Sequence, residues 1–280
     1  MNRLSIVFTL LFSFSSQAYV PKLQTIIQKL VGNRSENSSL VENEVKFQIE
    51  NEKLLVKERW IIKDSDNYLL EASGPNFKYY SLFLEGKRYR FSADSQQILM
   101  SELTPKQFEA MFFSNDPNFV SRYLVSLGLV SDKILKPVEP AFTLEEINNV
   151  REENLRLTRV DGEITYGIGL VAPENSKILP NQVWVVQDSF QVKKIRGPNF
   201  VVEARNYKNL RKDFSVATQR KIKTPEYTVE ITTNKITPIN VGPKTKKKFE
   251  LSYISSNPPM FPSTENAIYK HLKEFYLSFR

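Results

Sequence analysis

Residues 58–74, ERWIIKDSDNYLLEASG, place two short apolar runs on either side of a polar turn. Each run has the length of a β-strand, and the Asp, Ser and Asn residues between them are typical of a tight turn. Further runs of strand length follow at 79–84, 87–93 and 97–101, and strict apolar–polar alternation precedes them at 45–50. Strands this close together, joined by short turns, predict an antiparallel meander.

Two helical segments are expected to interrupt this meander. Residues 104–113, TPKQFEAMFF, open with Thr104 as N-cap followed by proline, and the glutamine three positions later completes a capping box. Residues 116–128, DPNFVSRYLVSLG, repeat the device with Asp116 as N-cap and Gly128 as the stop. Because these helices interrupt a sheet, we expect them to cover one of its faces.

The second half of the chain returns to strands and ends in an amphipathic segment. A tight hairpin is predicted around Asp161–Gly162. Further strands are predicted at 182–187, 190–196, 200–206, 226–232 and 248–254. In residues 263–280, an apolar face at helical spacing predicts a helix that packs on the sheet; its members are Ile268, Leu272, Phe275 and Phe279. With a short helix at 24–31, the fold class is mainly β.

The first 18 residues, MNRLSIVFTLLFSFSSQA, have the three parts of a secretory signal peptide. A basic start precedes an apolar run to Phe14, and small residues follow at Ser16 and Ala18. We expect cleavage after Ala18 and a periplasmic protein. The alternative, a transmembrane anchor, is disfavoured because the run is shorter than the roughly 20 apolar residues that span a bilayer. No cysteine follows the run, which excludes lipid attachment there.

The composition excludes most catalytic chemistry. The 280 residues contain no cysteine and one histidine, His271, so disulfides, a cysteine nucleophile and the usual transition-metal ligand sets are excluded. Residues 167–172, GIGLVA, match a dinucleotide-binding pattern in letters only, because Pro173 follows and no helix can begin there. We therefore expect no enzymatic activity, no metal and no cofactor.

Positive charge is concentrated late in the chain. Residues 19–140 carry 16 Lys or Arg and 16 Asp or Glu, whereas residues 190–250 carry 15 and 5. A local basic field suits an anionic partner, and in an exported protein that is an anionic membrane surface or an acidic protein face rather than nucleic acid. The alternative is a solvated strand edge on which lysines prevent aggregation.

Three hairpin stretches carry a family resemblance: residues 58–74, residues 84–104 (LEGKRYRFSADSQQILMSELT) and residues 182–196 (QVWVVQDSFQVKKIR). In this order, after an N-terminal helix and around inserted short helices, they resemble the periplasmic lipoprotein carriers of the LolA/LolB-like type. The resemblance runs from Pro21 to Pro238. The chain departs from many carriers, which have Arg-Pro where Asp64 and Ser65 follow a strand lysine here, so the lock that holds their lid helices shut is not expected.

The resemblance implies a strongly curved, incomplete antiparallel β-barrel with short helices over its open side. Residues 19–240 would form this half-barrel domain, and residues 241–280 an extension that ends in the terminal amphipathic helix. The concave face would bind the acyl chains of a lipid or lipoprotein, which a monomer would carry to or from the outer membrane. A chain that buries ~14 methylenes gains about 11 kcal/mol at ~0.8 kcal/mol each, enough to hold a lipid non-covalently.

The candidate cavity residues come from strand alternation, the inserted helices and the late hairpin. The strand positions are Trp60, Ile62, Tyr68, Leu70, Leu82, Tyr89 and Phe91, which could share one face. The remaining positions are Phe108, Met111, Phe112, Phe119, Tyr123, Leu124 and Trp184. The alternative is that these side chains form an ordinary core. In that case the same fold is a non-enzymatic adaptor or regulatory module with a packed interior.

A basic set completes the sequence-based hypothesis. Its members, expected on neighbouring late strands or their turns, are Lys193, Lys194, Arg196, Lys244, Lys246, Lys247 and Lys248. An anionic bilayer attracts each nearby cation by about 1 kcal/mol, so several together could dock the cavity mouth against a membrane.

Overall fold

The structure is a computed structural model that describes residues 20–32, 34, 38–50, 52–64, 66–132, 154–170, 179–211, 214–263 and 265–280. The expected signal peptide, residues 1–18 with cleavage after Ala18, lies outside these residues.

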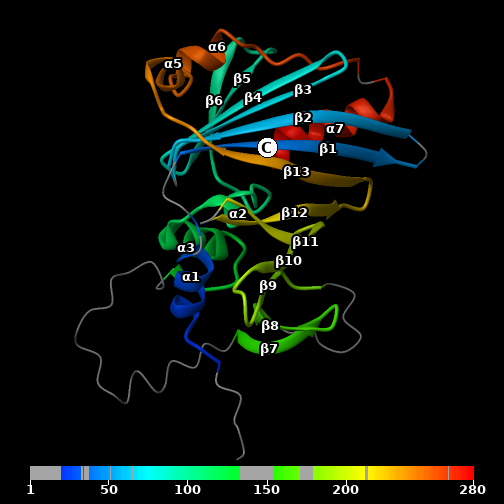
Figure 1. The fold of residues 1–280 in the computed structure, drawn as a ribbon. Helices are drawn as coiled ribbons and strands as arrows, with labels where there is room; N and C mark the ends of the chain where they lie inside the picture. Colours follow the sequence, from blue (N-terminus) through cyan, green and yellow to red (C-terminus); the bar gives the residue numbers. More distant parts are fainter. Residues whose placement is uncertain are drawn as a thin grey trace, which may run out of the picture.

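The described residues form one 13-stranded antiparallel sheet that does not close (Figure 1). Its first half contains β1 (Ser39–Ile49), β2 (Glu52–Ile62), β3 (Tyr68–Gly74), β4 (Phe77–Leu84), β5 (Lys87–Ser92) and β6 (Gln97–Glu102). Its second half contains β7 (Leu155–Val160), β8 (Glu163–Ile168), β9 (Gln182–Val186), β10 (Val192–Gly197), β11 (Phe200–Arg211), β12 (Phe214–Lys223) and β13 (Thr228–Pro238).

Each half is a meander, and the two halves meet where β13 pairs with β1. The strand order runs β6-β5-β4-β3-β2-β1-β13-β12-β11-β10-β9-β8-β7, so the first and second runs of strands lie side by side in one sheet. Val45 of β1 lies opposite Ile231 of β13 and Val56 of β2. The edges of the sheet are therefore β6 and β7, the strands that flank the helical interruption.

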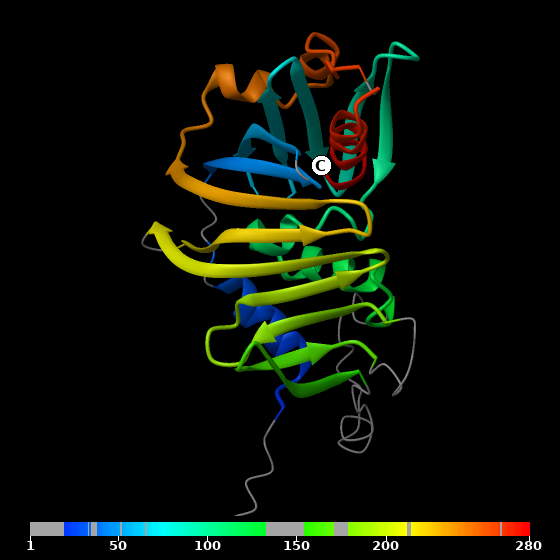
Figure 2. The same ribbon diagram turned by 90° about the vertical axis from the view of Figure 1, so that its right-hand side faces the viewer.

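Helices cover the concave face of the curved sheet (Figure 2). The helices α1 (Leu23–Gly32), α2 (Ala110–Phe113) and α3 (Pro117–Ser126) lie over the second half, where α2 contacts β12. The last helix, α7 (Ala267–Phe279), lies inside the curl of the first half, against β1 and β2. The mainly-β fold class, with a curved open sheet, short covering helices and a terminal helix, is confirmed.

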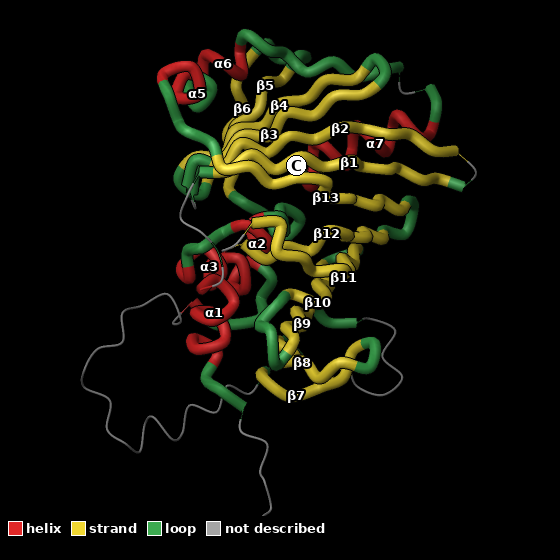
Figure 3. The backbone as a smooth tube through the Cα atoms, viewed as in Figure 1, coloured by secondary structure: helices red, strands yellow, loops and turns green. Residues whose placement is uncertain are grey.

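Two further short helices cover the opposite, convex face (Figure 3). They are α5 (Pro243–Lys247) and α6 (Leu251–Ser255), and α6 contacts β4, β5 and β6. The prediction of a strand at 248–254 is therefore wrong. The apolar residues of this segment, Phe249, Tyr253 and Ile254, pack on the convex face from α6 and the turn before it. These residues reach the edge strand β6 through α6 and add no strand to the sheet.

The chain then passes from the convex to the concave face beside β4. Met260 forms an isolated antiparallel bridge with Lys78, with both backbone hydrogen bonds made at 2.8 and 2.9 Å. The next residue, Phe261, packs on the rings of Phe77 and Tyr79, which belong to the concave side. Residues after 241 thus contribute to both faces of the sheet.

Backbone geometry confirms two local expectations. Asp116 caps α3, because its carboxylate accepts from the backbone N–H of Asn118 at 2.9 Å and of Phe119 at 3.1 Å. Asp161 and Gly162 have φ angles of 49° and 84°, the left-handed pair of a two-residue hairpin.

The helix expected from Thr104 begins later than expected. The Thr104 N–H donates to Gln107 Oε1 at 2.6 Å, as in a capping box, but α2 begins only at Ala110. Residues 105–109 form turns instead, in which the N–H of Gln107 bonds to the carbonyl of Thr104, three residues back. The tight turns shorten the helix to a single turn.

Candidate ligand-binding face

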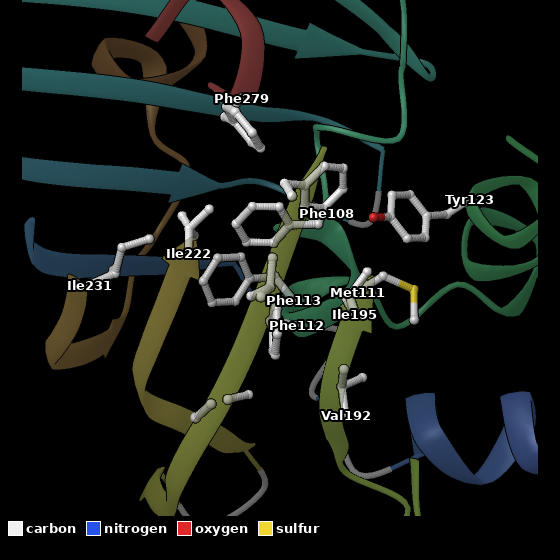
Figure 4. Close-up of a cluster of buried hydrophobic side chains, with 14 of the residues drawn as sticks. Phe108, Met111, Phe112, Phe113, Tyr123, Val192, Ile195, Ile222, Ile231 and Phe279 are labelled. Carbon is white, nitrogen blue, oxygen red and sulfur yellow. The ribbon is translucent and has the colours of Figure 1, made fainter. Parts of the chain in front are cut away.

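The concave face brings together ten of the fourteen expected cavity residues. Trp60, Tyr68 and Leu70 are buried in its core cluster, and Ile62 packs against that cluster. The inserted segment adds Phe108, Met111, Phe112, Phe119, Tyr123 and Leu124. Figure 4 shows Phe108, Phe112, Phe113 and Met111 directed toward the side chains of the facing strands. One apolar surface thus extends over both halves of the sheet.

Leu82, Tyr89 and Phe91 lie on the convex face, so the expectation that they share a face with Trp60 is wrong. Leu82 is buried beside Leu69 and Ile254, and the other two pack against that cluster. Alternation specifies that two sets of residues point opposite ways, but it does not specify which set faces the concavity. Here α6 covers the convex side of these strands, so their apolar residues are buried there.

Trp184 also faces away from the concave core. It is 7% exposed, and its strand neighbours Val183 and Val185, not Trp184 itself, belong to the concave cluster. The guanidinium of Arg196 lies 5.1 Å from its ring centroid and the ammonium of Lys194 lies 5.8 Å away. The expectation that Trp184 lines the cavity is therefore wrong. The aliphatic stems and the cation–π contacts of Lys194 and Arg196 cover its ring on the convex face.

The interior of the first half is filled by α7. Phe275 packs edge-on to Phe47 of β1 with ring centroids 4.9 Å apart, and Tyr276 packs on Phe77 of β4 at 4.7 Å. Phe279 meets the ring of Phe108 at 6.3 Å, a contact visible in Figure 4. Leu272, Phe275 and Tyr276 are each 0% exposed. The described helix thus fills the concavity of the first half of the sheet.

A buried cluster of four charges lies at the end of α7. Arg280 Nε is 2.9 Å from Glu58 Oε1, and its Nη2 is 2.9 Å from Glu109 Oε1. Arg220 Nη1 lies 3.7 Å from the other oxygen of Glu109. Two carboxylates and two guanidiniums balance one another, as charges removed from water must.

Polar neighbours complete the cluster around Glu58. This carboxylate accepts hydrogen bonds from the Tyr276 hydroxyl at 3.0 Å and from Trp60 Nε1 at 3.2 Å. Burial alone would lower the pKa of Arg280, but Glu58 and Glu109 outweigh it and raise this pKa above its ordinary value. Burial and Glu58 raise the pKa of Tyr276. The arginine therefore stays charged and the tyrosine stays a hydrogen-bond donor.

Side chains of the sheet also hold the backbone at the end of α7. Arg88 donates to the carbonyls of Tyr276 and Leu277, each at 2.8 Å, and to the hydroxyl of Tyr79 at 2.6 Å. Gln107 Nε2 donates to the Ser278 carbonyl. A cation at the carbonyl end of a helix complements the helix dipole and its unpaired carbonyls. The helix is therefore fixed by charge as well as by apolar packing.

A cavity of about 420 Å³ opens beside this end of α7. Its lining includes Arg88 and Arg90 of β5, Lys106 and Gln107 of the turn segment, and Leu277 and Ser278 of α7. This hollow adjoins both the sheet and the last helix.

The seven expected docking cations do not form one patch. Lys193, Lys194 and Arg196 lie on β10, whereas Lys244, Lys246 and Lys247 lie on α5. Lys248 pairs with Glu71 of β3 at 2.6 Å, and β3 is six strands from β10 in the sheet. At ~4.8 Å per strand the two groups are roughly 29 Å apart along the sheet. The error came from assigning 248–254 to a late strand.

Five charged residues of the concave face were not found by sequence reasoning: Glu58, Arg88, Glu109, Arg220 and Arg280. The sequence did contain a signal for Glu58. It alternates in phase with Val56 and Trp60, whose side chains point toward the concave face. Its partner Arg280 is 222 positions away, so no local pattern could connect the two.

Within the described residues, no group of three or more His, Asp or Glu side chains is arranged to hold a metal ion. His271 lies on α7 beside the ring of Tyr227, and its Nδ1 is 3.3 Å from Glu274. None of the helices in the described part of the chain combines the length and apolarity needed to cross a membrane.

Comparison with solved structures identifies the architecture. A LolA superfamily protein from Nitrosomonas europaea superposes with a TM-score of 0.52 at 13% identity, over 84% of this chain and 100% of that one. The chain has a LolA-like fold. An outer membrane lipoprotein-sorting protein domain from Vibrio parahaemolyticus gives a TM-score of 0.49 at 10% identity, over 83% of this chain and 97% of that one. No protein-family model and no curated protein matches the sequence.

The LolA-like half-barrel accounts for the placement of the buried residues. Its curvature turns β1–β5 around α7 and turns β8–β13 toward α1, α2 and α3. At 13% identity, this likeness shows the fold alone.

Proposed function

We propose that this protein is an exported, non-enzymatic binding protein that holds the acyl chain of a lipid or lipoprotein on its concave face. The proposal is supported by the LolA-like fold and by an apolar concave surface that covering helices, rather than strands, shield from water. Transfer to or from the outer membrane follows as the role of such a carrier. A chemical reaction is not required, because binding and release are exchanges between apolar environments.

The observation that carries the proposal is the position of α7. This helix enters the half-barrel from outside, after the bridge between Met260 and Lys78, and presents a stripe of apolar side chains to the sheet. Four of them, Leu272, Phe275, Tyr276 and Phe279, are at most 2% exposed. At 1.5–3 kcal/mol each, their burial amounts to about 6–12 kcal/mol.

A bound acyl chain would therefore bury about as much apolar surface as these four side chains of α7. A chain that buries ~14 methylenes gains about 11 kcal/mol. This lies within the range given for the four side chains, so apolar burial alone favours neither occupant. The polar contacts of Arg88 and Arg280 then favour the closed state when no ligand is present.

A second function is favoured by the completeness of the packing. Phe47, Trp60 and Phe108 are at most 1% exposed, and a charge cluster closes the end of the interior. If α7 never leaves, the protein is an adaptor or regulatory module that acts through its surface. The two functions differ in whether a lipid ever reaches the concave face.

Native mass spectrometry distinguishes them. The protein is purified from cells containing their membranes, without detergent, and sprayed under non-denaturing conditions; the control is the same protein refolded from denaturant without lipid. The carrier function predicts a population heavier than the control by the mass of an acyl-containing lipid. The adaptor function predicts identical masses for both samples, and oleate added in excess would then also leave the mass unchanged.

A further inference from the structure

We propose that the cations beside the end of α7, Arg88, Arg90 and Lys106, bind the anionic head group, phosphate or carboxylate, of the amphiphile whose acyl chain takes the place of α7 on the concave face. This inference rests on the proposed function and names the chemistry of its ligand. With α7 in place, the cavity that these cations line has a volume of about 420 Å³, within the range of small-molecule sites.

Two arginines of β5 lie on the concave side of the sheet. Arg88 and Arg90 lie opposite Ser101 and Leu99 of β6, on the concave side of β5, while Tyr89 between them packs on the convex cluster. Arginine is rarely buried without a partner because its charge must leave water. Arg88 has partners, since its guanidinium binds Ser81, Tyr79 and two carbonyls of α7.

Two cations beside the end of α7 remain uncompensated. Arg90 and Lys106 are half-buried, and neither makes an ion pair with any residue that the structure describes. The Lys106 ammonium lies 5.3 Å from the ring centroid of Phe279, directed toward the end of α7. Arg88 and Gln107 bind the carbonyls of Tyr276, Leu277 and Ser278, so these carbonyls do not serve as partners of Arg90 or Lys106.

The part of the lining that lies outside α7 also suits an anion. No acidic residue belongs to the lining, and Ser101 brings a hydroxyl group that can donate to an anion. Pro105 and Pro198 supply apolar walls where a chain attached to the anion would begin. A cationic centre with hydroxyl donors and an apolar exit suits an amphiphile with one anionic end.

Three ligands with the same ten-carbon chain test the inference: decanoate, decyl phosphate and decanol, titrated calorimetrically at low salt. We expect both anions to bind about tenfold more tightly than decanol, since a charge-assisted hydrogen bond contributes on this scale. The stronger of the two anions identifies the source of the head group. The double variant Arg90→Gln/Lys106→Gln should lose the preference for the anions and keep the affinity for decanol.

The control is Lys87→Gln, on the same strand but on the convex side, which should keep the preference for anions. Circular dichroism checks that each variant is folded. If the wild type binds decanol as tightly as the anions, or if the double variant keeps the preference, the head-group site is refuted while acyl binding stands. If none of the three ligands binds, the proposed function fails together with this inference.

Discussion

Arg280 and Glu58 form an ion pair that water does not reach. Nε of the arginine lies 2.9 Å from Oε1 of the glutamate, and both side chains are 0% exposed. The pair joins the end of the last helix to the second strand, 222 positions away in sequence. It therefore fastens α7 inside the half-barrel and couples the extension to the body of the fold.

Removing one member of this pair should destabilise the protein strongly. We expect Arg280→Met to lower the free energy of unfolding by about 3–5 kcal/mol, because Glu58 would keep a buried charge without its partner. The double variant Glu58→Gln/Arg280→Met should recover part of the loss. Urea unfolding of both variants measures the two values.

The matched control is an exposed pair on the convex face. Lys46 and Glu230 are 3.8 Å apart, with side chains 37% and 41% exposed. Lys46→Gln should change the free energy of unfolding by at most about 1 kcal/mol. A loss for Arg280→Met no larger than that of Lys46→Gln would show that the pair does not hold α7.

Stability should decline above pH 10. Burial raises the pKa of Tyr123 and Tyr276 well above the ordinary value of 10.0, so the native state keeps protons that the unfolded state releases. A raised native pKa contributes stability that is complete below pH 10 and is lost as pH rises toward the native pKa. Tyrosinate absorbance, measured together with urea unfolding across this pH range, should show that the buried tyrosines ionise only as the protein unfolds. Ionisation of all tyrosines near pH 10 in the folded protein would contradict this prediction.

The sequence predicted the strands better than it predicted the faces they bury. Hairpins such as Asp161–Gly162 and caps such as Asp116 depend on neighbouring residues, so short patterns predict them correctly. The side of the sheet on which Leu82 is buried depends on α6, a helix some 170 positions later, and no local pattern contains that information.

The same limit applies to the candidate site. The aromatic residues of the inserted helices were predicted because their spacing and caps are local. The charges were missed because a buried glutamate resembles a surface one until its partner is known, and Arg220 and Arg280 lie far from Glu109 in sequence. The basic set was wrongly joined because residues 248–254 alternate like a strand but form the turn after α5 and most of α6.

The α5 lysines should dock the protein on anionic membranes. Lys244, Lys246 and Lys247 are exposed and make no ion pair within the described residues. Replacing all three by Gln should weaken binding to vesicles containing anionic lipid on the order of 100-fold, at about 1 kcal/mol per cation. Sedimentation with vesicles measures it, and binding should fall as salt rises.

The control for docking is on β10. Lys193 pairs with Glu163 and Lys194 lies 3.9 Å from Glu203, so these charges are already compensated. Lys193→Gln/Lys194→Gln should bind the same vesicles almost as well as the parent. If the α5 variant retains full binding at low salt, these lysines are only a solubilising surface.

Export should be visible at the N-terminus of the purified protein. Cleavage after Ala18 predicts a mature chain that begins at Tyr19 and is released with the periplasmic fraction. N-terminal sequencing and cell fractionation check both. An intact Met1 recovered from the membrane pellet would contradict the expectation.

Two leucines separate loosening of α7 from general destabilisation. Leu272 on α7 and Leu69 on the convex face are each 0% exposed, and each Leu→Ala change should cost about 2–5 kcal/mol. Only Leu272→Ala should bind oleate more tightly, by about tenfold, because it weakens the competing occupant of the concave face. Equal oleate affinities in the two variants would contradict competition between α7 and the ligand.

The position of α7 when an acyl chain is bound shows directly whether the helix and the ligand compete for the concave face. The protein has no cysteine, so Lys57→Cys and Lys270→Cys, on exposed positions of β2 and α7, accept spin labels at two sites only. Electron–electron resonance then measures the distance between the labels with and without saturating oleate. We expect a second distance population that grows with the oleate concentration. An unchanged distance distribution, with oleate binding verified by calorimetry, would contradict displacement of α7 by the ligand.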